Sequence, residues 1–169
     1  RAVPARKGLK NKVRPLVVGD LSRKTVECTK CEQKKDVFAA CLAPEQHAVG
    51  LSAAIEKYAK SVMCLVEADD DAAVGLLDAV SAYNHIEREP ILEEAASEPE
   101  LADTLGYMAT FLCRKGKYSF YDDEGATHVI ESADGVDQGQ PMSPPEFAIG
   151  LRRALRAILR RAREMADTD

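Results

Sequence analysis

Two features of the sequence could carry chemistry, and the first is a carboxylate inside an apolar stretch. Asp78 lies within residues 72–80, which are otherwise apolar and follow three consecutive aspartates. This pattern predicts a β-strand that is buried on both faces. A buried carboxylate without a partner costs several kcal/mol, so we expect Asp78 to lie at the end of the strand or to bind a cation.

The second feature is Gln138-Gly139, which lies in a loop rich in Gly, Gln and Pro over residues 135–145. Glycine has no Cβ, so the chain can pass close to another group at this point. Pro144 and Pro145 predict the start of the last helix, because proline is tolerated in a first helical turn. Taken alone, such a loop is usually only a turn.

The elements that must position these residues follow from hydrophobic periodicity and from capping residues. We predict a strand over 12–18, a helix from about residue 20 to 42, and helices over about 88–97 and 99–114. We also predict a helix that Ser52 caps, with a buried stripe made of Ile55, Tyr58, Ala59 and Val62. Residues 117–121 and 127–131 alternate around a polar turn, which predicts a β-hairpin. The last helix should run over about 145–165, with its arginines facing solvent, and bury an apolar stripe made of Phe147, Leu151, Leu155, Ile158, Leu159 and Ala162.

Composition and charge narrow the class of protein. The chain has 169 residues and 46% apolar residues, which suits one domain, and no apolar run approaches the roughly 20 residues of a membrane span. Five scattered cysteines favour reduced thiols and an intracellular setting, in the cytoplasm or nucleus. Residues 1–35 hold eleven Lys or Arg, residues 66–104 hold twelve Asp or Glu, and residues 152–163 hold six Arg. Basic ends around an acidic middle suit a polyanion bound beside a cation site, although solvated helix faces give the same pattern.

Four segments together resemble the reverse transcriptases (RNA-directed DNA polymerases) of non-LTR retrotransposons. Asp78-Ala-Val-Ser-Ala-Tyr-Asn84 has the form of their motif A, and Val136-Asp-Gln-Gly-Gln-Pro-Met-Ser-Pro144 has the form of their motif B, sixty residues on. Lys12-Val-Arg-Pro-Leu16 resembles their fingers segment, and Ala43-Pro-Glu-Gln-His-Ala-Val-Gly50 resembles a linking element of the family. The resemblance covers residues 12–160, and the two ends of the sequence look cut from a longer protein.

The resemblance implies an α+β fold, namely a partial right-hand polymerase with fingers at 1–66, an incomplete palm at 67–169 and no thumb. It implies template-directed deoxynucleotidyl transfer that uses an RNA template, a DNA primer, dNTPs and two Mg²⁺ ions. Hard cations of this kind prefer carboxylate oxygens. In the family the aspartate at Asp78 binds both metals, and the carbonyl of the next residue, here Ala79, helps to hold the second.

The resemblance also assigns nucleotide-binding roles. Tyr83 matches the aromatic steric gate that selects deoxynucleotides, although a core aromatic would fit the same position. Arg14, with Lys12 behind it, matches the cations that grip the triphosphate, a task suited to a forked guanidinium. Gln138 and Gly139 match the loop that passes close to the base pair and sugar.

The departures from the family point to an inactive fragment. Motif C, an aromatic-x-Asp-Asp turn, follows motif B in the family, and the sequence ends before that point. Phe120-Tyr-Asp-Asp123 spells the motif, but it precedes motif B, so we predict a simple hairpin turn there. We expect no polymerase activity from residues 1–169 alone, and self-association through the uncovered stripe of the last helix.

Two other classes of function stay open. One is a nucleic-acid-binding remnant of a retroelement that has no metal site. The other is a helical protein-interaction module in which the motif matches are accidental. The absence of a central strand that carries Asp78 would favour the module.

Overall fold

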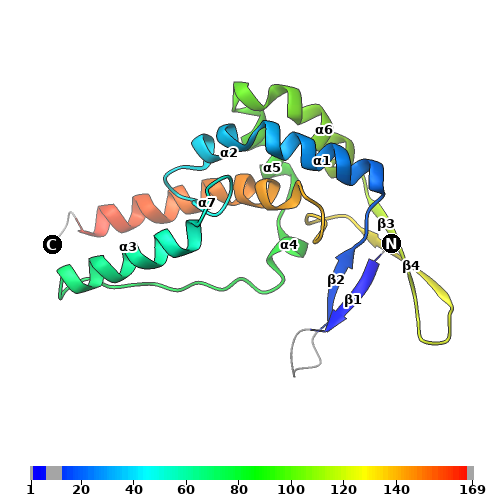
Figure 1. The fold of residues 1–169 in the computed structure, drawn as a ribbon, viewed down its shortest axis with the longest axis horizontal. Helices are drawn as coiled ribbons and strands as arrows, with labels where there is room; N and C mark the ends of the chain where they lie inside the picture. Colours follow the sequence, from blue (N-terminus) through cyan, green and yellow to red (C-terminus); the bar gives the residue numbers. More distant parts are fainter. Residues whose placement is uncertain (1, 7–12, 167–169) are drawn as a thin grey trace.

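The computed structural model describes residues 2–6 and 13–166, with side chains for residues 16–165. It is a mixed helix and strand fold in which two antiparallel hairpins lie near each other at one end of a group of helices (Figure 1). The strands are β1 (Ala2–Arg6), β2 (Val13–Val17), β3 (Gly116–Tyr121) and β4 (Thr127–Ser132). The helices are α1 (Leu21–Gln33), α2 (Lys35–Leu42), α3 (Ala54–Ala68), α4 (Ala82–His85), α5 (Arg88–Ala96), the 3-10 helix η1 (Pro99–Leu101), α6 (Ala102–Leu112) and α7 (Ser143–Ala166).

The core forms where α5 packs against α6 and against the first half of α7, with α2 closing one side. Its largest buried side chains come from all four helices, namely Phe38, Leu42, Ile91, Met108 and Ile149. Residues from both of the predicted fingers and palm segments therefore share one core.

Local sequence signals predict several elements correctly. The side chain of Asp20 accepts a hydrogen bond from the Ser22 N–H at 2.8 Å and so caps α1. The predicted hairpin of β3 and β4 forms, with Tyr121 opposite Thr127, and Gly125 adopts a φ of 83° in its turn. The Asp122 carboxylate accepts from the Ala126 N–H at 2.7 Å, so the aromatic-x-Asp-Asp sequence at 120–123 is a hairpin turn, as predicted.

The predicted single helix over about 20–42 is wrong, since α1 and α2 are separate helices that meet at Lys34. Lys34 has a φ of −102° and a ψ of 10°, and its ammonium group binds the Glu100 carbonyl and the Asp103 carboxylate, each at 2.9 Å. The sequence has neither proline nor glycine at this point, so nothing local indicates the break.

The buried stripe predicted on the helix after Ser52 is also wrong. Helix α3 begins at Ala54, its N-cap is Ala53 rather than Ser52, and none of its residues is buried. Ile55 is 77% exposed and Tyr58 is 59% exposed. Figure 1 shows the reason, because α3 lies away from the core helices α5 and α6.

The most important correction concerns the strand predicted over residues 72–80. These residues run as an irregular, exposed connection between α3 and α4, with Leu76 at 92% and Leu77 at 87% exposure. A strand that is buried on both faces needs a partner strand and covering helices. Within the described ranges, each strand pairs only inside its own two-stranded hairpin, so none is available to residues 72–80.

Helix α7 is long and has two different halves. Its first half packs in the core through Ala148 and Ile149, whereas Ile158 is 51% exposed and Leu159 is 39% exposed in the second half. The predicted apolar stripe is therefore covered only in part.

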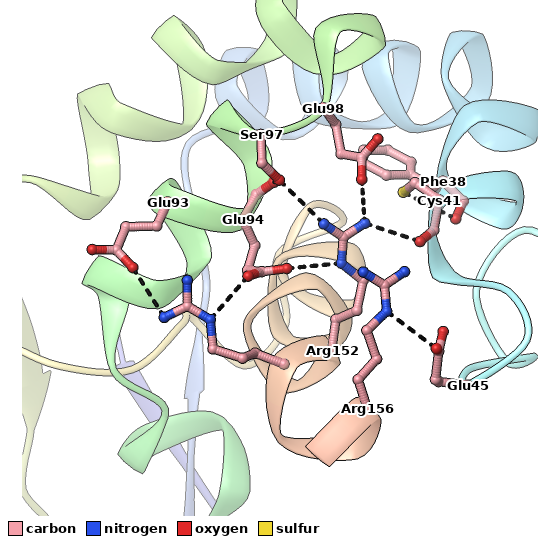
Figure 2. A network of polar contacts seen from close by, with 10 residues as sticks. Phe38, Cys41, Glu45, Glu93, Glu94, Ser97, Glu98, Arg152 and Arg156 are labelled. Carbon is pink, nitrogen blue, oxygen red and sulfur yellow. Dashed lines mark hydrogen bonds and ion pairs between the residues drawn. The ribbon is translucent and has the colours of Figure 1, made fainter. Parts of the chain in front are cut away.

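Figure 2 shows the polar network that fixes the middle of α7 to the rest of the fold. Arg152 is 3% exposed, and its guanidinium donates to Glu94 at 2.9 Å, to Glu98 at 2.5 Å and to the Cys41 carbonyl at 3.0 Å. The sequence predicts that the arginines of α7 face solvent, whereas the Arg152 side chain is buried. Its buried charge is compensated by two carboxylates, which ties α2, α5 and α7 together.

Candidate nucleotide-binding site

The loop that carries Gln138 and Gly139 packs directly on strand β2. The Val17 N–H donates a hydrogen bond to the Gln138 carbonyl at 2.8 Å. Gly139 has a φ of 111°, and a Cβ on it would lie 3.0 Å from the Val17 carbonyl oxygen. Only glycine adopts this backbone conformation easily in so narrow a space, which explains its presence here.

The same loop is bonded to helix α4, which carries Tyr83. The Val136 N–H donates to the Tyr83 carbonyl at 2.7 Å, and the Gly135 N–H donates to the Ile86 carbonyl at 2.9 Å. The Tyr83 ring stacks on Phe147 of α7, with ring centroids 4.8 Å apart and planes 7° apart. Burial raises the pKa of the Tyr83 hydroxyl. Tyr83 is thus held both by its backbone and by its ring.

An open pocket of about 510 Å³ lies where these elements meet. It brings together three of the predicted nucleotide-binding residues, Tyr83, Gln138 and Gly139, and adds Lys24 and Cys28 from α1. Lys24 adds a cation to this pocket, and no motif in the sequence predicts it there. The role of this pocket in nucleotide binding stays a prediction.

Gln140 forms part of the pocket wall and is 3% exposed. Neither its side-chain oxygen nor its side-chain nitrogen has a hydrogen-bond partner in the described part of the chain. A Cβ on Gly19 would lie 2.1 Å from the Gln140 Nε2, so the turn after β2 accommodates this amide only because residue 19 is glycine. Gln140 therefore acts as a spacer between the loop and the start of α1.

Of the two cations predicted to bind the triphosphate, Arg14 and Lys12, only Arg14 lies within the described residues. Arg14 lies in β2, where it pairs with Ala5 of β1, and β2 is the strand that contacts the Gln138 carbonyl. Lys12 lies outside the described residues. The backbone of Arg14 therefore lies three residues before Val17, the residue that contacts the Gln138 carbonyl, and the triphosphate role of Arg14 stays a prediction.

Asp78 and Ala79 occupy the exposed connection and not the tip of a buried strand. Five residues separate Asp78 from Tyr83, so their Cα atoms are at most about 18 Å apart. Within residues 2–6 and 13–166, no group of three or more His, Cys, Asp or Glu side chains could hold a metal ion. The described residues therefore do not fit a pair of Mg²⁺ ions, and the predicted ligands Asp78 and Ala79 have no companions there.

The Cys28-x-x-Cys31 pair does not make a zinc site either. Both cysteines lie on α1, and the Cys31 thiol donates to the Pro141 carbonyl with an S···O distance of 3.4 Å. Burial raises the pKa of Cys31 to about 11, which disfavours the thiolate that zinc requires. All five cysteines are free.

A buried polar cluster supports the loop from behind. Arg23 of α1 binds Glu27 at 2.7 Å and Asp137 at 2.9 Å, and the Tyr118 hydroxyl of β3 also donates to Asp137. The other oxygen of Glu27 accepts from the Met142 N–H at 3.3 Å. Asp137 comes directly before Gln138, so this cluster fixes the loop between α1 and β3.

Glu146 lies beside this cluster in the first turn of α7 and is 5% exposed. Burial, together with the neighbouring charge of Glu27, raises the pKa of the Glu146 carboxyl to about 8. No hydrogen bond to this carboxyl occurs among the described side chains. At neutral pH most Glu146 side chains therefore carry a proton, although the sequence alone offers no sign of this.

Comparison with known proteins gives one relevant similarity. No known protein family's sequence profile matches the chain. Over 86 residues, or 51% of the chain, it is 31% identical to the "Retrotransposable element SLACS 132 kDa protein" of Trypanosoma brucei gambiense. The matched segment spans 7% of that protein's length. The similarity indicates a retroelement-related origin. In the described helices, none is long and apolar enough to cross a membrane.

Proposed function

We propose that the chain is part of the reverse transcriptase domain of a retrotransposon protein and carries its deoxynucleotide-binding surface. The observation that carries this proposal is the single pocket shared by Tyr83, Gln138 and Gly139, with strand β2 bonded to its loop. These groups come from three segments that the polymerase resemblance had selected independently. The similarity to a retrotransposable-element protein supports the same origin.

In this proposal the chain forms a partial right-hand polymerase fold, and the reaction of the longer parent protein is template-directed transfer of a deoxynucleotide to a primer end. The residues described do not fit the metal pair, so we assign them binding roles only. Tyr83, fixed against Phe147, presents a flat surface on which a sugar can rest. Gln138 and Gly139 line the same pocket as Tyr83, and Lys24 offers charge to the phosphates.

The first test is primer extension on a poly(rA)/oligo(dT) template with purified residues 1–169. We expect no incorporation of labelled dTTP, because the described carboxylates do not form a metal site. Incorporation that depends on Mg²⁺ and is lost in Asp78→Asn would contradict this assignment, because it would show that the described residues also catalyse the reaction.

The second test measures nucleotide binding directly, by competition of dTTP and UTP against a fluorescent dTTP analogue. We expect dTTP to compete better than UTP, and Tyr83→Ala to remove this preference, since the small side chain leaves room for a 2′-hydroxyl. Tyr58→Ala is the matched control, because Tyr58 is exposed on α3 and outside the pocket. Equal competition by both nucleotides in the unchanged protein would contradict the proposal.

A helical interaction module is the second candidate, and one observation favours it. The predicted central strand that carries Asp78 is absent from residues 72–80, and this absence is the result that such a module predicts. The same segment exposes Leu76, Leu77 and Val80, a surface suited to a protein partner. Binding of dTTP that weakens in Tyr83→Ala would favour the reverse transcriptase candidate. A helical interaction module, in which the motif matches are accidental, should not bind dTTP.

A further inference from the structure

Helix α3 presents an apolar face to solvent, since none of its residues is buried. The apolar residues of this face recur at steps of three, four and three, namely Ile55, Tyr58, Val62 and Leu65. Residues 73–75 lie beside the face and complete an open groove of about 540 Å³, which is lined mainly by apolar side chains. A groove of this kind suits the apolar face of a partner helix.

The second half of α7 carries an exposed stripe with the same kind of spacing. Its members recur at steps of four, three and four, namely Leu151, Leu155, Ile158 and Ala162. Alternating steps of three and four make a repeat of seven residues, and helices with this repeat pack along each other through their apolar stripes. The spacing on α7 therefore matches the spacing on α3.

The two stripes end beside opposite charges. Residues 66–71, at the end of α3, hold four acids and no base, and residues 153–163 of α7 hold five arginines and no acid. Among the described side chains, no ion pair involves these four acids, and none involves Arg160 or Arg163. Opposite charges beside matching apolar stripes favour a contact between α3 and α7.

This contact does not form within one copy of the chain, because Ile55 is 77% exposed and Ile158 is 51% exposed. Figure 1 shows that α3 and the second half of α7 both extend toward the end of the long axis opposite the hairpins. One copy therefore offers both surfaces at the same end, as a two-fold pair requires. A contact between two α7 helices would instead place arginines opposite arginines, and like charges disfavour it.

We propose that two copies of this chain associate reciprocally, with the apolar stripe of each α7 in the α3 groove of the other copy. Arg160 and Arg163 then lie opposite Asp70 and Asp71. The sequence predicts self-association through α7, and the proposal adds α3 as the surface that receives it. The groove shares no lining residue with the pocket of Tyr83, so this association does not depend on the proposed function.

The test is sedimentation equilibrium of residues 1–169 with two charge reversals at exposed positions. The first variant is Arg160→Glu with Arg163→Glu, and the second is Asp70→Lys with Asp71→Lys. Each alone should weaken dimerisation roughly tenfold or more, because attraction becomes repulsion at both contacts of the pair. An equimolar mixture of the two variants should restore the affinity of the unchanged protein, since opposite charges then face each other at both contacts.

Two control variants make the same changes of net charge outside both surfaces. Lys115→Glu with Lys117→Glu matches the first variant, and Asp123→Lys with Glu124→Lys matches the second. Both controls should associate as the unchanged protein does, and circular dichroism checks that every variant is folded. Equal weakening in the controls would overturn the proposal, because it would show a response to net charge alone.

The mixture separates contact between copies from every other arrangement. A mixture that stays as weak as its two components would overturn the proposal, and so would a clean monomer of the unchanged protein at high concentration. Full-strength association of Asp70→Lys with Asp71→Lys would also overturn it, because α7 would then pair without α3. Tyr83→Ala should leave the association unchanged, so failure of the dimer is distinguishable from failure of the proposed function.

Discussion

The substitution Glu146→Gln should remove a large pH dependence from the stability of this protein. Glu146 is buried in the first turn of α7, and its pKa rises from 4.5 to about 8 in the folded state. Between these values the folded chain holds a proton that the unfolded chain has released. The folded state therefore has its full stability below about pH 4.5 and loses stability as the pH rises toward 8.

The size of this change in stability follows from the difference between the pKa of Glu146 in the unfolded and folded states. Each pH unit is worth about 1.4 kcal/mol, so ionisation of Glu146 costs the folded state at most about 5 kcal/mol. Over the accessible range from about pH 5 to about pH 8, the cost amounts to roughly 3 kcal/mol. Glutamine has a similar shape and no charge, so it should remove this cost.

Urea unfolding followed by circular dichroism at several pH values measures this difference. Relative to the unchanged protein, Glu146→Gln should gain about 3 kcal/mol between about pH 5 and about pH 8. Glu124→Gln in the exposed hairpin turn is the control, and its stability should run parallel to that of the unchanged protein. A stability difference for Glu146→Gln that stays constant across this range would refute the reasoning.

Three further predictions concern packing. Gly139→Ala should cost about 1–3 kcal/mol in the free energy of unfolding, because its φ is 111°. Gly106→Ala within α6 should not destabilise the fold, because the added Cβ meets open space and alanine favours a helix. Arg152→Ala should cost about 3–5 kcal/mol, because Glu98 loses its partner and Glu94 keeps only the exposed Arg153. Arg161→Ala, which breaks an exposed pair, should cost less than about 1 kcal/mol; urea unfolding checks both substitutions. Sedimentation velocity should show association that increases with concentration, driven by the exposed second half of α7, and a clean monomer at high concentration would contradict this.

The elements that the sequence predicts well are those with strong local signals. The β3–β4 hairpin has alternating residues around Asp122 and Gly125, and α1 has Asp20 as its cap, so both can be found without tertiary information. The segment over 72–80 shows the opposite case. Its apolar composition is compatible with a buried strand, but a strand also needs pairing partners, and no local pattern shows whether they are present.

The supporting cluster behind the loop could not be found from the sequence. Arg23 and Asp137 are 114 residues apart, and Glu27 and Met142 are 115 residues apart, so only the folded chain brings them together. Arg152 illustrates the same limit, since it belongs to a series of arginines that periodicity assigns to solvent. The pocket of Tyr83, Gln138 and Gly139 was partly predictable because the family resemblance selected these residues, whereas Lys24 joins it only through the geometry of α1.

The most direct test of the central claim is a titration of ¹⁵N-labelled protein with dTTP, followed by amide chemical shifts. If the pocket binds a deoxynucleotide, the largest shifts should fall on Gly139, Gln140 and the Val17 amide, which donates to the Gln138 carbonyl. They should disappear in Gln138→Ala combined with Tyr83→Ala. Saturable shifts that cluster on α3 and residues 72–80, with none on the 138–140 loop, would contradict the account.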